Sequence, residues 1–128
     1  MAITDARVSP SEMHCISASA NGSVCGDRNE AFAIEAIFKG QASHIPVMAI
    51  KSQLGEVLGA SGALQAVALL QTIGNGVLPG ITGLQQAPDL PALNVSAQPR
   101  SVKVDVGLIN SAGFDGNACS MLIARPER

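Results

Sequence analysis

The feature that most constrains the fold is a run of 32 residues, 57–88, that contains no Asp, Glu, Lys, Arg or His. A chain of 128 residues makes about one small domain, whose large surface leaves little room to bury such a run. A membrane span needs about 20 predominantly apolar residues. Here glycine, proline and polar residues interrupt the run (Gly74, Gly76, Pro79, Gly80 and Gly83; Ser61, Gln65 and Gln71). The pattern therefore predicts a buried helix and no transmembrane segment.

The composition excludes several classes of protein. Hydrophobic residues make up 47% of the chain and charged residues 14%, whereas a disordered chain combines low hydrophobicity with high charge. The net charge of −2 leaves no basic field for a nucleic-acid backbone or an anionic membrane. Aromatic residues are 2%, too few for base stacking. We therefore expect neither nucleic acid nor a membrane as a partner.

The cysteines and histidines give no metal or disulfide pattern. Cys15, Cys25 and Cys119 are too scattered for a disulfide framework or a Cys-x-x-Cys site, so we expect buried, reduced thiols in a cytoplasmic protein. The first residues do not resemble a signal peptide. His14 and His44 have no ligand spacing, so no metal site is expected.

Hydrophobic periodicity predicts an α/β chain in the order strand–helix–strand–helix–strand–strand. Asp27 is the predicted N-cap of the first helix and forms a capping-box-like pair with Glu30. The predicted buried face of this helix consists of apolar residues at helical spacing (Ala31, Ile34, Ile37 and Phe38). The second helix has no clearly polar side and must therefore be buried all round. The predicted elements are a strand at 13–18, a loop at 19–26, a helix that ends at Gly40, a strand at 45–50, a helix at 54–74, an irregular connection at 77–98, a strand at 102–108, a turn at 110–117 and a closing strand at 118–124.

Residue types alone suggest few reactive sites. Gly55, Gly59 and Gly62 could cradle a phosphate, but their spacing favours close helix packing instead. No serine has a histidine base in a nucleophile motif. Lys51 lies beside the predicted buried helix and needs a carboxylate partner, for which Glu30 is the obvious candidate.

Three segments, in order, resemble motifs of the C-terminal third of a β-ketoacyl-acyl-carrier-protein synthase. Residues 16–27, with Glu30, lie on the family's Ala-His-Gly-Thr-x-Thr-Pro-x-x-Asp-x-x-Glu motif. Residues 51–62 match Lys-Ser-x-x-Gly-His-x-x-Gly-Ala-x-Gly, and residues 110–116 match Asn-Ser-Phe-Gly-Phe-Gly-Gly. The resemblance covers roughly residues 5 to 124, and three ordered motifs make chance agreement improbable.

The resemblance implies the C-terminal half of a thiolase-like α/β fold, with the order βαβαββ and layers of sheet and helices. Two similar halves pack face to face in that family, and the helix at 58–73 would be covered on both sides. Residues 1–128 would then form a single C-terminal synthase-like domain that is incomplete without an N-terminal half.

The same resemblance implies site roles and shows two departures. Active synthases use a cysteine nucleophile, which lies in the N-terminal half, and two histidines that help to decarboxylate malonyl and to stabilise an oxyanion. Ser19 and Glu56 occupy those histidine positions here. Lys51 and Glu30 occupy the family's supporting Lys–Glu pair, and Phe114 occupies the acyl-pocket gate. The resemblance implies neither a cofactor nor a metal.

Retention of the scaffold without the histidines is typical of chain length factors. We therefore expect a non-catalytic subunit, or part of one, in type II polyketide or fatty-acid-like biosynthesis. Its partners would be an active ketosynthase, the complementary N-terminal half, or both, together with an acyl carrier protein. Two alternatives stay open. One is a divergent active component that condenses acyl and malonyl units, with Glu56 as a base whose pKa burial has raised. The other is a degenerate remnant without a biochemical role.

Overall fold

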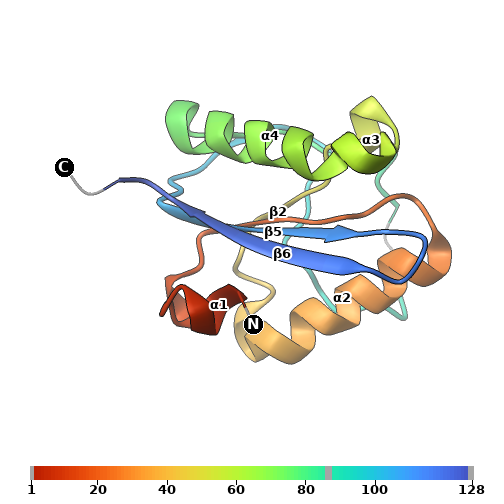
Figure 1. The fold of residues 1–128 in the computed structure, drawn as a ribbon, viewed down its shortest axis with the longest axis horizontal. Coiled ribbons are helices and arrows are strands. Elements are labelled where there is room, and N and C mark those ends of the chain that lie inside the picture. The colour runs from red at the N-terminus through yellow and green to blue at the C-terminus, as the bar shows by residue number, and fades with distance from the viewer. Residues whose placement is uncertain (1, 86–87, 127–128) are drawn as a thin grey trace.

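The chain folds around a central sheet with helices on both faces. The structure is a computed structural model that describes residues 2–85 and 88–126. The sheet has the strand order β2-β1-β5-β6. Strands β2, β1 and β5 run parallel, and β6 pairs antiparallel with β5 at one edge. Helices α3 and α4 cover one face, and α1 and α2 lie on the other (Figure 1). The strands are β1 (Cys15–Ser17), β2 (Val47–Met48), β5 (Val106–Ala112) and β6 (Ala118–Ala124), and the helices are α1 (Ala2–Asp5), α2 (Val24–Phe38), α3 (Lys51–Leu54) and α4 (Ser61–Asn75). The predicted α/β class and the closing hairpin are confirmed.

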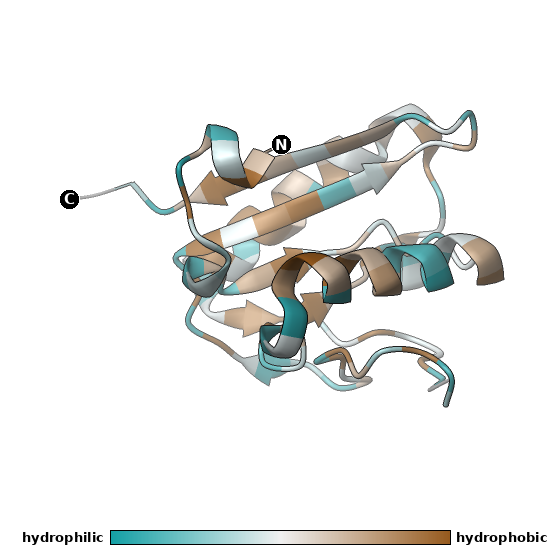
Figure 2. Cartoon of the chain, turned by 90° about the horizontal axis from the view of Figure 1, so that it is seen from below, coloured by the Kyte–Doolittle hydropathy of each residue, from teal (hydrophilic) through white to brown (hydrophobic). Residues whose placement is uncertain are grey.

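Short elements complete the fold. The 3₁₀ turns in the described part of the chain are η1 (Pro10–Glu12), η2 (Lys39–Gln41) and η3 (Leu58–Ala60), and a second, two-stranded sheet pairs β3 (Val77–Leu78) with β4 (Arg100–Ser101). Hydrophobic residues run along the strands of the main sheet, whereas hydrophilic residues lie mainly in the connections and along parts of the helices (Figure 2).

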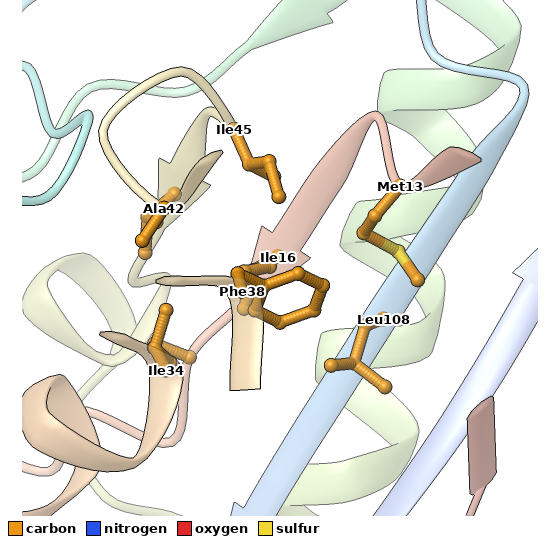
Figure 3. Close-up of a cluster of buried hydrophobic side chains, with 9 residues drawn as sticks. Met13, Ile16, Ile34, Phe38, Ala42, Ile45 and Leu108 are labelled. Atoms are coloured by element: carbon orange, nitrogen blue, oxygen red, sulfur yellow. The ribbon is translucent and has the colours of Figure 1, made fainter. Parts of the chain in front are cut away.

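Alternating side chains divide the core into two clusters, because successive residues of a strand point to opposite faces. Ile16 of β1 and Leu108 of β5 point toward α2, where they meet Phe38 (Figure 3). Cys15 and Ile109, their neighbours on the same two strands, point toward α4. All three residues of β1 are buried, which explains why its sequence shows no simple alternation.

Helix α2 starts earlier than its sequence suggests. Its N-cap is Ser23, whose hydroxyl accepts a hydrogen bond from the Gly26 amide at 3.3 Å. The prediction of Asp27 as the N-cap was therefore wrong, and part of the predicted loop at 19–26 is helical. Ala31, Ile34 and Phe38 form the buried face as predicted, but Ile37 is exposed.

The helix predicted at 54–74 is interrupted. α3 ends at Gly55, which has a φ of +79°, and Leu58 has a φ of +52°. A continuous helix cannot contain these left-handed residues, so the chain turns before α4 begins at Ser61. One face of α4 is buried, but its outer residues Val67 and Leu70 are 55% and 52% exposed. Within this chain the helix is therefore not buried all round.

The strand predicted at 102–108 also lies further along the chain, at 106–112. The Val102 amide donates to the Gly76 carbonyl at 2.9 Å, which attaches the start of the alternating segment beside β3 rather than to the main sheet. Val104 is buried in the cluster under α4. The apolar alternation of residues 102–108 therefore comes partly from a packed connection before β5 and partly from β5 itself.

The cysteines differ from expectation. Cys15 is buried, and burial raises the pKa of its thiol to about 12, but Cys25 and Cys119 are exposed. The prediction of three buried thiols was therefore wrong for two of them. Among residues 2–85 and 88–126, none of the helices combines the length and apolar character that crossing a membrane requires.

Candidate functional site

The three motif segments meet at the carboxyl ends of the parallel strands, where open α/β sheets commonly place their sites. Ser19 follows β1, Lys51 follows β2 and Ala112 ends β5. The Ala112 amide donates to the Ser19 hydroxyl at 3.1 Å, so the first and third motifs are joined directly. The Lys51 ammonium donates to the same hydroxyl at 3.4 Å, which adds the second motif.

Lys51 is buried and pairs with Glu56. Its ammonium nitrogen lies 2.8 Å from Glu56 Oε2, with the two side chains 4% and 20% exposed. The expected direct ion pair with Glu30 is not formed between these residues, which the structure describes in full. Glu56 follows Lys51 by five residues, across the turn at Gly55, and its carboxylate takes the place expected for Glu30.

Glu30 bonds to the backbone instead of to Lys51. Its two carboxylate oxygens accept hydrogen bonds from the backbone amides of Ser19 and Ala20, at 2.8 and 2.9 Å. These bonds hold the turn after β1, where Ala20 has a φ of +34°. Burial raises the pKa of the Glu30 carboxyl, and the two amide bonds oppose that shift.

Glu56 is the most heavily bonded carboxylate of the site. Besides Lys51, its Oε1 accepts from the Leu58 amide at 2.9 Å and from the Ser61 hydroxyl. The hydrogen bonds from Lys51 and Ser61 lower the pKa of the Glu56 carboxyl to about 2. The alternative hypothesis expected burial to raise this pKa, and that expectation was wrong. A carboxylate held ionised by a cation is a weak base near neutral pH.

Gln65 of α4 is a residue that the sequence analysis did not select as functional. It is fully buried, and its amide nitrogen donates to the carbonyls of Ala18 and Asn110 at 2.9 and 2.8 Å. It therefore ties the end of β1 to β5 directly before the Ser19 turn. The signal was a glutamine four residues before Leu69, on the apolar face of a helix without charged residues.

Phe114 lies apart from this network, in the turn between β5 and β6, and is 74% exposed. A cavity of about 590 Å³ lies on the α2 side of the sheet, lined by Asp27, Glu30 and mostly apolar residues, and Phe114 is not on its wall. The role of Phe114 as an acyl-pocket gate stays a prediction.

The glycine series does not serve helix packing as expected. A Cβ added at Gly55 or Gly59 would meet nothing within 4 Å, and one at Gly62 would come no closer than 3.9 Å to Ser111 Oγ. The close approach is at Gly107 of β5, where an added Cβ would lie 2.6 Å from Leu69 Cδ1. Gly55 is needed instead for its positive φ.

The histidines lie outside the Lys51 site. His14 is exposed, and its Nδ1 accepts from the Val106 amide at 3.3 Å, while His44 is exposed in the turn before β2. Within the described ranges 2–85 and 88–126, no three His, Cys, Asp or Glu side chains are grouped to hold a metal ion.

The family model for the β-ketoacyl synthase C-terminal domain matches residues 1–85, about two thirds of the sequence. The chain belongs to the β-ketoacyl synthase family. It is 35% identical over 125 residues to the chloroplastic 3-oxoacyl-(acyl-carrier-protein) synthase I of Hordeum vulgare, covering 97% of this chain and 27% of that relative. The chain therefore spans less than a third of the length of this synthase.

Solved structures agree with the family. The ishigamide ketosynthase/chain length factor superposes with a TM-score of 0.90 at 28% identity, over 98% of this chain and 31% of the other. A complex of a type II polyketide synthase acyl-carrier protein with its ketosynthase (AntDE:AntF) gives a TM-score of 0.91 at 30% identity, over 97% of this chain and 31% of that one. The fold is that of the C-terminal half of a thiolase-like ketosynthase, as predicted.

Proposed function

We propose that this chain is the C-terminal part of a non-catalytic, chain-length-factor-like synthase subunit that pairs with an active ketosynthase. Its pathway would be type II polyketide or fatty-acid-like biosynthesis on an acyl carrier protein, and its compartment the cytoplasm. The observation that carries the proposal is the network in which the Lys51 ammonium bonds to both Ser19 and Glu56. By motif alignment, Ser19 and Glu56 stand where active synthases have histidines.

Chemistry supports this assignment. A neutral imidazole can donate to a developing oxyanion, whereas the Glu56 carboxylate has only acceptors and would repel it. The Lys51 ammonium is already paired with the Glu56 carboxylate. The low pKa of Glu56 also argues against the alternative in which this residue acts as a general base.

The outer surface of α4 supports an incomplete domain that pairs with further protein. Val67 and Leu70 are half-exposed on a helix without a charged residue, and Leu58 before it is 69% exposed. Burying side chains of this kind contributes about 1.5–3 kcal/mol each. We assign this face to the complementary N-terminal half, and Lys51 and Glu30 to support of the site.

Pairing is tested by co-purification of the chain with its complementary half and the cognate ketosynthase. A Val67→Asp/Leu70→Asp variant should lower the recovered complex at least tenfold, because two buried apolar contacts become unpaired charges. The matched control is Val24→Asp on α2, at a residue that is 88% exposed on the other side of the sheet, and it should pair normally. Equal recovery of both variants would contradict the proposed pairing face.

The catalytic assignment is tested in the assembled complex. Glu56→Gln should leave malonyl decarboxylation within twofold of the parent rate, since the proposed subunit performs no chemistry. Loss of decarboxylation with an intact complex would instead support the divergent-enzyme alternative.

A further inference from the structure

Glu56 is bound as a ligand would be bound. Its two carboxylate oxygens receive three donors: the Lys51 ammonium on Oε2, and the Leu58 amide and Ser61 hydroxyl on Oε1. Charge-assisted bonds of this kind are about twice as strong as those between neutral groups. The three donors come from α3, η3 and the first residue of α4, and we call them the carboxylate cradle.

Contacts other than those to Glu56 hold the donors in place. Lys51 is 7% exposed, and its ammonium also donates to Ser19 Oγ, which the Ala112 amide fixes from the other side. Ser61 is 5% exposed at the start of α4. Leu58 presents its amide from a left-handed backbone with a φ of +52°, a conformation that costs free energy unless its surroundings impose it.

Removal of the Glu56 carboxylate would therefore leave a buried ammonium without its ion-pair partner. Such a group is costly, so the cradle would favour a replacement anion of the same shape. The Glu56 side chain is 20% exposed, which places the position of its carboxylate within reach of solvent.

We infer that the carboxylate cradle is a latent binding site for a small carboxylic acid and that Glu56 is its built-in occupant, which excludes external carboxylates. The bidentate arrangement suits a carboxylate better than a spherical anion such as chloride. The inference concerns only contacts within this chain and does not depend on the proposed pairing function.

The test uses the Glu56→Ala variant of the full chain, purified with any partner that accompanies it, and sodium acetate as the probe. Acetate should raise the Tm of Glu56→Ala by about 5 °C once its concentration exceeds the dissociation constant tenfold. Sodium chloride at equal ionic strength should give less than 1 °C, and the parent chain should respond equally weakly to both salts. If Glu56→Ala does not fold in chloride, its refolding yield in acetate replaces the Tm.

Two matched variants separate the cradle from a general salt effect. Glu56→Gln keeps the volume of the side chain, fills the cradle and should show no acetate response. Lys51→Met in the Glu56→Ala background removes the cation and should abolish the response. The inference is overturned if acetate and chloride act alike on Glu56→Ala, as they would if Lys51 turned to the nearby Asp27 carboxylate. It is also overturned if the Lys51→Met double variant still responds.

Discussion

Helices α2 and α4 are each 15 residues long and pack on opposite faces of one sheet, yet their outer surfaces differ. α2 carries four charged residues, of which Arg28 is exposed, with its guanidinium 5.4 Å from the centre of the Phe32 ring, while Asp27, Glu30 and Glu35 are half-buried. α4 carries no charged residue and exposes aliphatic side chains. The absence of charge on α4 is what we expect of a helix that meets the proposed N-terminal half, although α2 also exposes the apolar side chains of Val24, Phe32 and Ile37. The predictions below test this comparison, from the largest effect to the smallest.

The largest effect should come from the two cores, which are expected to support the sheet equally. Phe38→Ala, on the buried face of α2, should lower the free energy of unfolding by about 3–5 kcal/mol. Leu69→Ala, on the buried face of α4, should lower it by about 2–5 kcal/mol, because each substitution leaves a cavity. Chemical denaturation measures both. A cost below about 1 kcal/mol for Leu69→Ala alone would mean that α4 does not pack on the sheet in the free chain.

A smaller loss should follow from crowding α4 against β5. Gly107→Ala places a Cβ against the side chain of Leu69 and should cost about 1–3 kcal/mol. Gly40→Ala on the α2 side is the control, since an added Cβ there meets nothing within 4 Å, and it should change stability by less than about 0.5 kcal/mol. Equal costs at both positions would contradict the close approach at Gly107.

The two site carboxylates should respond to pH in opposite directions. The pKa of Glu56 is lowered to about 2, so its contribution to stability is complete above its ordinary value of 4.5 and is lost as the pH falls toward 2. The pKa of Glu30 is raised, so its contribution is complete below 4.5 and declines as the pH rises through the folded value.

Stability curves of Glu56→Gln and Glu30→Gln against pH check these signs. The deficit of Glu56→Gln should shrink toward pH 2, and the deficit of Glu30→Gln should grow as the solution becomes acidic. Parallel curves for the two variants would show that Lys51 does not distinguish the carboxylates.

The smallest effect should come from the outer surfaces of the free chain. Leu70→Lys on α4 and Val24→Lys on α2 replace exposed side chains and should each change the free energy of unfolding by less than about 0.5 kcal/mol. Only the assembled complex should separate them, with Leu70→Lys weakening assembly. A large loss for Leu70→Lys in the free chain would mean that its own residues already cover α4.

Local patterns predicted the fold well where packing and hydrogen bonding agreed with them. The strand at 118–124 has the predicted bounds, and the buried face of α2 includes Ala31, Ile34 and Phe38. Backbone geometry explains the failures. Nothing in hydrophobic periodicity encodes the left-handed φ at Leu58 that separates α3 from α4, and Val102 satisfies the alternation of a strand although its amide bonds to Gly76.

The sequence predicted which residues form the candidate site better than it predicted which of them pair with each other. The motifs placed Ser19, Lys51 and Glu56 in one region, and the structure brings them into one network. The partner of Lys51 could not be derived, because both Glu30 and Glu56 were acidic and close in the motif pattern. The distances in three dimensions decide between them.

The position of β6 at the edge of the sheet bears on how the chain behaves in a concentrated solution. Natural sheets protect open edges with charged residues, prolines, bulges or very short strands. β6 is seven residues long, contains neither a charged residue nor a proline, and has four exposed residues at its start. Its free backbone edge is therefore a template for strands from other copies. Aggregation through β6 would compete with assembly whenever this chain is produced without the N-terminal half that we propose as its partner.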